Sequence, residues 1–234
     1  MLLDGAHLLA EALDAGIEVT DVAIANGASD RPELSALRRR VPHAVLASDL
    51  VIAAMSPARS PSGVVALARR PVDGTSGMFS RGTPLVVIAA DVQDPGNLGA
   101  LLRSAEAGGA TGVIATATGA DPFGWKALRG AMGSAFRLPV ARVPDGAAAV
   151  ALARSHALRI AAAIGRGGTS MSEADLTGPL ALVVGGEGSG LSDALVASAD
   201  VQVTIPMTPP VESLNVSVAA ALLVFEARRQ RARH

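Results

Sequence analysis

The sequence predicts an α/β protein in which a large parallel sheet, covered by helices on both faces, follows a smaller α/β unit. Strand-like segments after Pro84 are almost continuously apolar, which is usual for strands buried on both faces. Helical patterns alternate with them, and this alternation favours parallel strands joined by helical crossovers. Between the two parts, residues 69–83 are rich in Gly, Ser and Arg and lack apolar periodicity, which is typical of a linker.

The N-terminal part opens with a helical pattern at residues 5–15. Leu8, Leu9 and Leu13 recur there at helical spacing, and Gly16 follows where a helix commonly ends. Further strands are expected at Val19–Ala25, Val41–Leu46 and Gly63–Ala68, and further helices at Pro32–Arg40 and Ser48–Met55. We therefore expect a first domain at residues 1–76, a linker at 77–83 and a second domain at 84–234.

The second part carries the longer α/β pattern. Strands are expected at Leu85–Ala90, Gly112–Ala115, Leu158–Ile164, Leu180–Val184 and Val201–Ile205. Helices are expected between and after them at 97–107, 122–131, 146–156, 192–198 and 214–230.

Composition excludes several classes of protein. Half of the 234 residues are apolar and 18% are charged, so the chain is not disordered. It has no Cys, which excludes a disulfide framework, a thiolate zinc site and a Cys nucleophile. The four His are far apart in the sequence, so we expect no metal site. Met1-Leu2-Leu3-Asp4 is not a signal-peptide start, and no apolar run approaches membrane-spanning length. These features predict a cytoplasmic protein without membrane association.

Glycines cluster at the ends of predicted strands, where open α/β sheets bind ligands. The segment GGEGSG at 185–190 follows a strand, yet no frame of it gives the G-x-G-x-x-G pattern of dinucleotide sites. The segment GRGGTS at 165–170 lacks the lysine of a phosphate-binding P-loop. A dinucleotide-dependent oxidoreductase thus remains an alternative with little support.

Two more segments run from a strand end into a helix. In the first, DVQDPGNLGALLR at 91–103, Asn97 is expected as the helix N-cap and Arg103 follows six residues later. A lone Arg there is typical of a side chain that extends from a half-buried helix to solvent. In the second, IPMTPPVESLNVSV at 205–218, a proline-rich loop precedes an amphipathic helix, and Ser213 or Asn215 is a candidate cap.

Three patterns occur in this order along the chain: N-x-G-x3-R, G-G-E-G-x-G-L-S and I-P-M-x5-S-L-N-V-S-V-A. Taken together, they resemble the three signature motifs of the SpoU (TrmH-like) family of SPOUT methyltransferases. The segment KALRGAMGSAFRLP at 126–139 is similar to the family's segment between its first two motifs. Residues 1–68 are similar to its small ribosomal-protein-like substrate-binding domain. The resemblance covers nearly the whole chain.

The resemblance implies a function and a fold that composition and periodicity do not give. Family members transfer a methyl group from S-adenosylmethionine to a ribose 2′-hydroxyl of RNA, work as homodimers, and thread the C-terminal end of an α/β sheet into a trefoil knot. By position, the cofactor would contact Gly185, Gly186, Glu187, Gly188, Ile205, Met207, Leu214 and Asn215. Glycines allow backbone amides to approach a ligand, and the apolar side chains suit an adenine slot. No metal is required.

The resemblance also implies catalytic roles. Arg103 corresponds to the family's catalytic arginine, which helps to remove the proton from the ribose hydroxyl. A guanidinium is a poor base because it holds its proton at neutral pH. Arg103 has two alternative roles: it could align the hydroxyl, or it could neutralise a phosphate or the developing alkoxide. Asn97 would orient Arg103 or the RNA, Glu187 would hold the loops or a neighbouring Arg, and Ser213 and Asn215 would position Arg103 across the dimer.

RNA contacts must come from local patches because 20 basic and 21 acidic residues give a net charge of −1. Candidates are Arg38-Arg39-Arg40, Arg69-Arg70 and the tail from Arg228 to Arg233. Aromatic residues are too few for a stacking platform of the RRM or OB type. The two-domain layout favours ribosomal RNA over tRNA as substrate. The alternative is a non-catalytic RNA-binding relative with the same fold.

Overall fold

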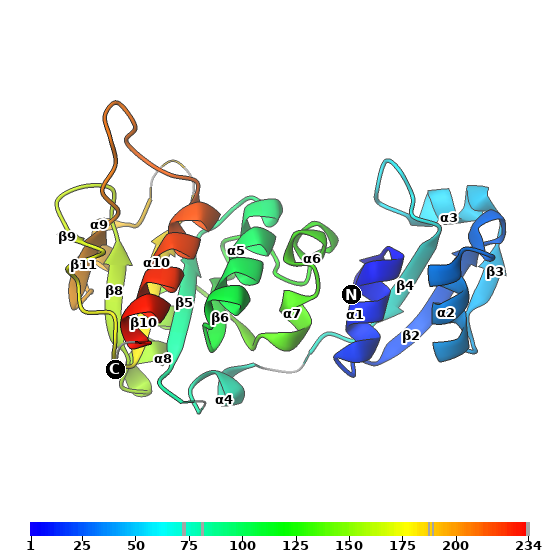
Figure 1. Cartoon of the computed structure of the whole chain (residues 1–234), viewed down its shortest axis with the longest axis horizontal. Coiled ribbons are helices and arrows are strands. Elements are labelled where there is room, and N and C mark those ends of the chain that lie inside the picture. The colour runs from blue at the N-terminus through cyan, green and yellow to red at the C-terminus, as the bar shows by residue number, and fades with distance from the viewer. Residues whose placement is uncertain (72–73, 81, 187, 189, 233–234) are drawn as a thin grey trace.

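The computed structural model describes residues 1–71, 74–80, 82–186, 188 and 190–232. It contains two sheets, each with its own helices, and Figure 1 shows the smaller, N-terminal one beside the larger one. No helix in the described ranges is long and apolar enough to cross a membrane.

The N-terminal unit has a four-stranded mixed sheet. Its elements are β1 (Leu2–Asp4), α1 (Ala6–Asp14), β2 (Val19–Ala25), a 3-10 turn (Asn26–Ala28), α2 (Pro32–Arg40), β3 (Val45–Ala47), α3 (Asp49–Met55) and β4 (Val64–Ala68). The strand order is β1-β4-β2-β3, in which β3 runs parallel to β2 and the other neighbours are antiparallel. The sequence pattern did not predict β1, because three residues are too few to show alternation.

The C-terminal unit has a seven-stranded sheet in which every neighbouring pair is parallel. Its strand order is β7-β6-β5-β10-β8-β11-β9. The strands are β5 (Leu85–Ala90), β6 (Gly112–Thr116), β7 (Val140–Val143), β8 (Arg159–Ala163), β9 (Thr169–Ser170), β10 (Leu180–Gly185) and β11 (Val201–Thr204). The helices are α4 (Thr75–Met78), α5 (Pro95–Gly108), α6 (Trp125–Ala131), α7 (Ser134–Arg137), α8 (Gly146–Ser155), α9 (Asp193–Ala197) and α10 (Val216–Arg231). The predicted parallel α/β sheet is confirmed.

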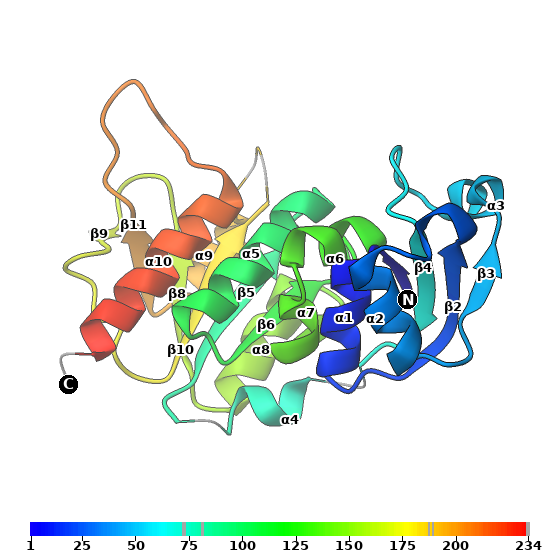
Figure 2. The ribbon, with the colours of Figure 1, turned by 45° about the vertical axis from the view of Figure 1, so that its right-hand side comes forward.

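Alternate residues of the central strands enter two different apolar layers. On β5, Leu85 and Val87 belong to the layer that includes the buried faces of α5 and α10, whereas Val86 and Ile88 belong to the layer covered by α8. Both sets are fully buried, so the strand reads as an uninterrupted apolar run. Figure 2 shows α5 and α10 side by side on one face of the sheet.

The stretch predicted as a linker contains a helix. Within the expected boundaries of 77–83 lies the end of α4, and its Met78 is fully buried against Gly112 of β6. A four-residue helix is too short to show a periodic signal, which explains why the sequence indicates only a loop. The strands β7 and β9 are also absent from the sequence prediction, for the same reason as β1.

The start of α5 corrects one prediction. Its N-cap is Asp94 rather than Asn97, because the Asp94 carboxylate accepts a hydrogen bond from the Asn97 backbone N–H at 2.8 Å. Pro95 then occupies the first helical turn, where its fixed φ and missing N–H are tolerated. Asn97 therefore lies inside the first turn and its side chain is available for contacts outside the helix.

Charged side chains join the two units. Arg137 of α7 donates to Glu106 of α5 at 2.7 Å and forms an ion pair with Glu11 of α1. The hydrogen bond from Arg137 holds the pKa of the Glu106 carboxyl below its ordinary value. A second pair joins Arg70 to Asp121 at 2.6 Å. The helix α6 also packs against β1, so α6 and α7 form the junction between the units.

Candidate functional site

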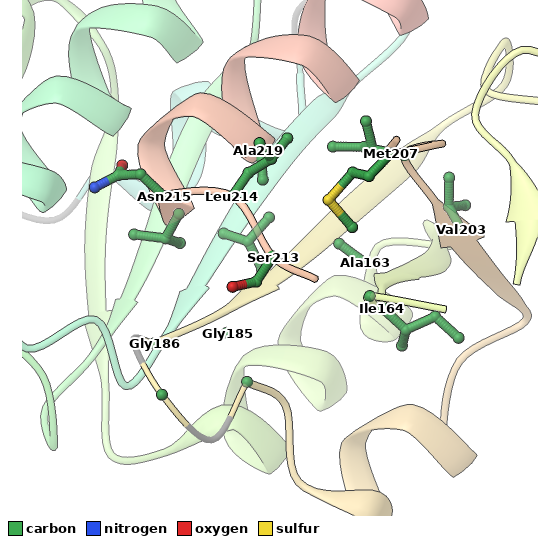
Figure 3. Close-up of a pocket in the computed structure, with 16 residues that line it drawn as sticks. Ala163, Ile164, Gly185, Gly186, Val203, Met207, Ser213, Leu214, Asn215 and Ala219 are labelled. Carbon is green, nitrogen blue, oxygen red and sulfur yellow. The ribbon is translucent and has the colours of Figure 1, made fainter. Parts of the chain in front are cut away.

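A cavity of about 480 Å³ opens at the carboxyl edge of the C-terminal sheet. Its walls come from the loops that follow β8, β10 and β11 and from the beginning of α10. Figure 3 shows Ile164 and Met207 on one side of this cavity and the glycine segment at Gly185 and Gly186 on another. The volume lies within the range of pockets that hold small organic ligands.

The structure brings most of the predicted cofactor residues together. Seven of them line the cavity: Gly185, Gly186, Gly188, Ile205, Met207, Leu214 and Asn215. Ser213, predicted as a catalytic residue, lines it as well. The eighth cofactor candidate, Glu187, which is also a predicted catalytic residue, lies outside the described residues.

The glycine segment is in backbone contact with its neighbours. A Cβ at Gly186 would overlap the Asp91 carbonyl oxygen, and a Cβ at Gly185 would overlap the Gly190 backbone. Gly188 and Gly190 have φ values of 90° and 66°, a region that L side chains rarely adopt. The segment therefore requires glycine on steric grounds, and it presents main-chain groups to the cavity.

Asp91 anchors this contact from the end of β5. Its own φ is 55°, and its carboxylate accepts hydrogen bonds from Thr116, at 3.0 Å, and from Thr118. Its backbone N–H donates to the buried Thr116 hydroxyl at 2.9 Å. The end of β5, the end of β6 and the glycine segment after β10 are thus held in one fixed arrangement.

The Asn97 and Asn215 side chains join two of the sequence motifs directly. Asn215 is the N-cap of α10: its Oδ1 accepts from the Ser217 backbone N–H at 2.9 Å, and its Nδ2 donates to Asn97 Oδ1 at 2.9 Å. These residues are 118 positions apart in the sequence. Asn215 thus serves both as a helix cap and as a link between α5 and α10 at the rim of the cavity.

Arg103 does not line the cavity of its own chain. Its side chain is exposed on α5, one turn after Gly99, and it forms no ion pair or hydrogen bond with the residues that the structure describes. Its guanidinium is therefore available to a group from outside this chain.

Sequence reasoning missed one wall of the cavity. Ala163, Ile164 and Gly165 line it from the end of β8, and Ala219 lines it from α10. The available signal was the position of Gly165 directly after a predicted strand, but its glycine tract matches no motif that would assign it to a ligand.

The predicted arginine patches differ in how many of their side chains are bonded to other groups of the chain. In the C-terminal tail, Arg228 donates to the Ala107 carbonyl and Arg229 pairs with Glu226, while Arg231 donates to four carbonyl oxygens. The described part of this tail is thus used within the fold and does not form a free basic patch; Arg233 lies outside it. Arg40 pairs with Asp14.

The remaining patch residues divide in the same way. Arg69 pairs with Glu18 and Arg70 with Asp121. Arg38 and Arg39 are exposed on α2 and have no ion-pair partner among the described residues.

In the described ranges, no group of three or more His, Cys, Asp or Glu side chains is arranged to hold a metal ion.

The fold and the cavity define a class: a parallel α/β protein with a small-molecule site built from loops at the carboxyl edge of its sheet. The comparisons with known proteins identify the family. The model of the SpoU rRNA Methylase family matches residues 84–225, and the chain belongs to that family.

Relatives and solved structures match nearly the whole length of the chain. The chain is 34% identical over 236 aligned residues to the uncharacterized tRNA/rRNA methyltransferase slr1673 of Synechocystis, covering 98% of this chain and 84% of that one. It is 30% identical to the Bacillus subtilis 23S rRNA (guanosine(2553)-2′-O)-methyltransferase RlmP, covering 97% and 88%. The SpoU methyltransferase AviRb from Streptomyces viridochromogenes, solved in complex with AdoMet, superposes with a TM-score of 0.91 at 28% identity, covering 99% and 90%.

Proposed function

We propose that this chain is an S-adenosylmethionine-dependent methyltransferase that acts on a ribose 2′-hydroxyl of RNA, with ribosomal RNA favoured over tRNA. The observation that carries the proposal is the gathering of seven predicted cofactor residues around one cavity. Family membership supports methyl transfer to RNA, and the name of the Bacillus relative supports the ribose position and the ribosomal substrate. The AdoMet complex of AviRb supports the cofactor.

The residues of the cavity fit this cofactor. Gly185, Gly186 and Gly188 line the cavity and have no side chains of their own, so their main-chain groups suit hydrogen bonding to polar edges of a ligand. Ile205, Met207 and Leu214 supply apolar surface for a flat purine ring. The residues after β8, Ile164 and Gly165, extend the same wall.

The reaction moves a methyl group from a sulfonium to the ribose oxygen and releases one proton. The cofactor, when bound, supplies the electrophilic methyl group. The chain must then align the hydroxyl and stabilise the developing negative charge on its oxygen, for which the exposed Arg103 guanidinium is suited. Asn97 and Asn215, hydrogen-bonded to each other beside the cavity, would fix the surface on which the ribose lies.

A homodimer is part of the proposal. Val218, Leu222 and Phe225 form an exposed stripe at helical spacing on α10, each between 38% and 47% exposed. The stripe continues from Leu214 at the rim of the cavity. Exposed apolar surface of this kind marks an association site, and pairing about α5 and α10 would offer Arg103 of one subunit to the cavity of the other.

Two further features of the family belong to the same proposal. The order β5-β10-β8-β11-β9 inserts later strands between earlier ones, which supports threading of the C-terminal end into the family's trefoil knot. The four-stranded N-terminal unit is proposed as the RNA-binding domain, with residues 1–76 as its extent and 77–83 as the connection to residues 84–234. Its exposed Arg38 and Arg39 support this role.

The first test is calorimetric titration with S-adenosylmethionine. We expect one binding site per subunit, abolished by Leu214→Arg, which places a charged side chain in the proposed slot. Leu50→Arg on exposed α3 is the matched control and should bind normally. Methyl transfer to deproteinised ribosomal RNA and to bulk tRNA is then compared, and the position of the methyl group is identified by resistance of that linkage to alkaline hydrolysis. A folded wild-type protein that binds cofactor but methylates neither RNA would contradict the enzyme and favour the binding-only relative.

The dimer is tested by mixing two inactive variants. Arg103→Ala lacks the arginine and Leu214→Arg lacks the cofactor slot, so a mixed dimer restores one complete site if Arg103 acts across the interface. Random mixing should recover about a quarter of the wild-type activity, because half of the dimers are mixed and each has one good site. No recovery would place Arg103 and its cavity in the same subunit.

A further inference from the structure

The exposed face of α6 combines an aromatic ring with two cations. Trp125 is partly exposed at the beginning of the helix, and Lys126 and Arg129 are exposed beside it. The Lys126 ammonium lies 5.6 Å from the centroid of the indole ring, and the Arg129 guanidinium lies 5.8 Å from it. Neither cation forms an ion pair with a carboxylate of the described residues. Both charges are therefore available to a ligand.

α6 packs directly on α5, the helix that carries Arg103. Gly99 of α5 packs directly on the α6 backbone, where a Cβ would overlap the Ala127 carbonyl oxygen. Arg103 follows Gly99 by one helical turn and so emerges on the side of α5 that faces α6. Lys126 precedes Gly130, the other glycine of this helix contact, by one turn and emerges on the side of α6 that faces α5.

α6 also lies between the two units of the chain. It packs against β1 of the N-terminal sheet and against α5 of the C-terminal unit, and Figure 2 shows it between α5 and α1. Its first residue follows the loop from the carboxyl end of β6, the edge at which the cavity opens. The N-terminal unit is proposed to bind the RNA, and one ribose of that RNA is methylated at this edge. Such an RNA would pass over α6 between the two places.

We propose that Trp125, Lys126 and Arg129 form an RNA-binding surface that holds nucleotides flanking the methylated ribose. The indole stacks on one unpaired base, and the two cations bind the phosphates next to it. Stacking on an aromatic ring with neighbouring cations is the general way in which proteins hold single-stranded RNA. Here one ring is sufficient, because it anchors a single nucleotide and does not build a platform. The inference rests on the proposed RNA substrate.

The chain provides its own probe for this surface. Trp125 is the only Trp, and there is no Tyr, so the tryptophan emission of the whole protein comes from α6. We expect this emission to be quenched as a short single-stranded oligo(A) is titrated into the 234-residue chain. Trp125→Leu should weaken RNA binding about tenfold or more, whereas Trp125→Phe should keep most of it because the ring remains.

The cations are tested by the dependence of RNA binding on salt. Replacing both Lys126 and Arg129 by Gln should lower the slope of log affinity against log salt by about 1.4, since each single-strand phosphate contact contributes about 0.7. Arg159→Gln, an exposed arginine at the opposite edge of the sheet, is the matched control and should leave the slope unchanged. The affinity for S-adenosylmethionine should be the same in all of these variants, and the melting temperature checks that each one folds.

Three results would overturn the inference. If the emission stays constant while RNA binds, α6 does not contact the RNA. The same conclusion follows if Trp125→Leu and the double Gln variant both bind RNA with wild-type affinity. Emission that changes with protein concentration in the absence of RNA would assign the face to a second copy of the chain. A failure of the proposed function is distinct: the wild-type protein would then neither bind S-adenosylmethionine nor methylate ribosomal RNA.

Discussion

The two edges of the seven-stranded sheet are built in opposite ways. At the amino edge, polar groups are bonded within the chain: Arg231 donates to the carbonyl oxygens of residues 83, 84, 176 and 178, and Gln230 bonds the backbone of residues 171, 174 and 176. At the carboxyl edge, glycine backbone faces a cavity and Arg103 has no partner among the described residues.

This difference separates stability from activity within one domain. Groups whose hydrogen bonds are all made within the fold contribute to its free energy of unfolding, and their loss leaves buried polar atoms unpaired. Groups that are left available contribute only when a ligand arrives. Substitutions at the two edges should therefore affect different measurements, and the following variants test how complete the separation is.

The largest effect is expected from Arg103→Ala at the carboxyl edge. Methyl transfer to RNA should fall by about 100-fold or more, because a preorganised positive charge is removed from the reacting oxygen. The melting temperature should not change, since the side chain is exposed and unpaired within the described fold. The assay is transfer of labelled methyl groups to RNA, with Arg103→Lys as the control that keeps the charge. A large loss of stability in Arg103→Ala would show that the two edges are not separate.

Arg231→Met at the amino edge should give the converse result. The guanidinium is half-buried, and burial lowers the pKa of Arg231 from its ordinary value. Loss of its hydrogen bonds leaves several carbonyl oxygens without donors, so we expect the free energy of unfolding to fall by about 3 kcal/mol. Urea unfolding measures the change, and calorimetry should find an unchanged affinity for S-adenosylmethionine.

The control for Arg231 lies two residues earlier. Arg229, whose side chain is exposed, pairs with the largely buried Glu226 of the same helix, and Glu226 keeps a hydrogen bond from Gln230, so Arg229→Met should lower the unfolding midpoint much less than Arg231→Met does. If both variants unfolded alike, the net charge of the C-terminal helix, and not the carbonyl contacts, would explain the effect.

The sequence predicted the carboxyl edge better than the amino edge, for a physical reason. The cavity loops need glycine where backbones touch, as at Gly186, and small sets of polar residues, and such requirements appear as motifs. The interactions of the amino edge join residues of ordinary type that are far apart in the chain, such as Arg231 and Thr83. Nothing in the local sequence around either residue reveals that they meet.

The errors in the prediction have the same origin. Asn97 and Asp94 are both good N-cap residues, and the contact between Asn97 and Asn215, across 118 positions, is visible only in the folded chain. Likewise, the arginines of the C-terminal tail form a basic run in the sequence, but the fold uses Arg228, Arg229 and Arg231 in internal contacts. Local pattern predicts which residues are available for a role, whereas long-range packing decides which role they have.

Asn215 contributes both to the fold, as the cap of α10, and to the cavity that it lines. Its variants test whether stability and activity can be separated at one residue. Asn215→Ala should lower the free energy of unfolding by about 1 kcal/mol through loss of the cap, and should also weaken cofactor binding. Asn215→Asp keeps the acceptor for the Ser217 N–H but loses the donor to Asn97. We expect Asn215→Asp to retain normal thermal stability with reduced methyl transfer. Equal activity in Asn215→Asp and wild type would show that the link between the asparagines has no catalytic consequence.

The smallest effect concerns Asp200 at the amino edge, and it depends on pH. A hydrogen bond from the Ile160 backbone N–H, at 2.7 Å, together with one from Arg154, holds the pKa of the Asp200 carboxyl below its ordinary value. A lowered pKa in the folded state favours folding above the ordinary Asp value of about 4, and this contribution disappears as the pH falls toward the lowered value. Asp200→Asn should therefore be less stable than wild type at pH 7, and the difference in melting temperature should narrow as the pH falls below the ordinary Asp value of about 4. Cofactor affinity at pH 7 should be the same for both proteins, because Asp200 lies at the end of the sheet away from the cavity. A difference in melting temperature that is constant with pH would mean that ionisation of Asp200 contributes nothing to the stability of this edge. The carboxyl group would then act only as a hydrogen-bond acceptor.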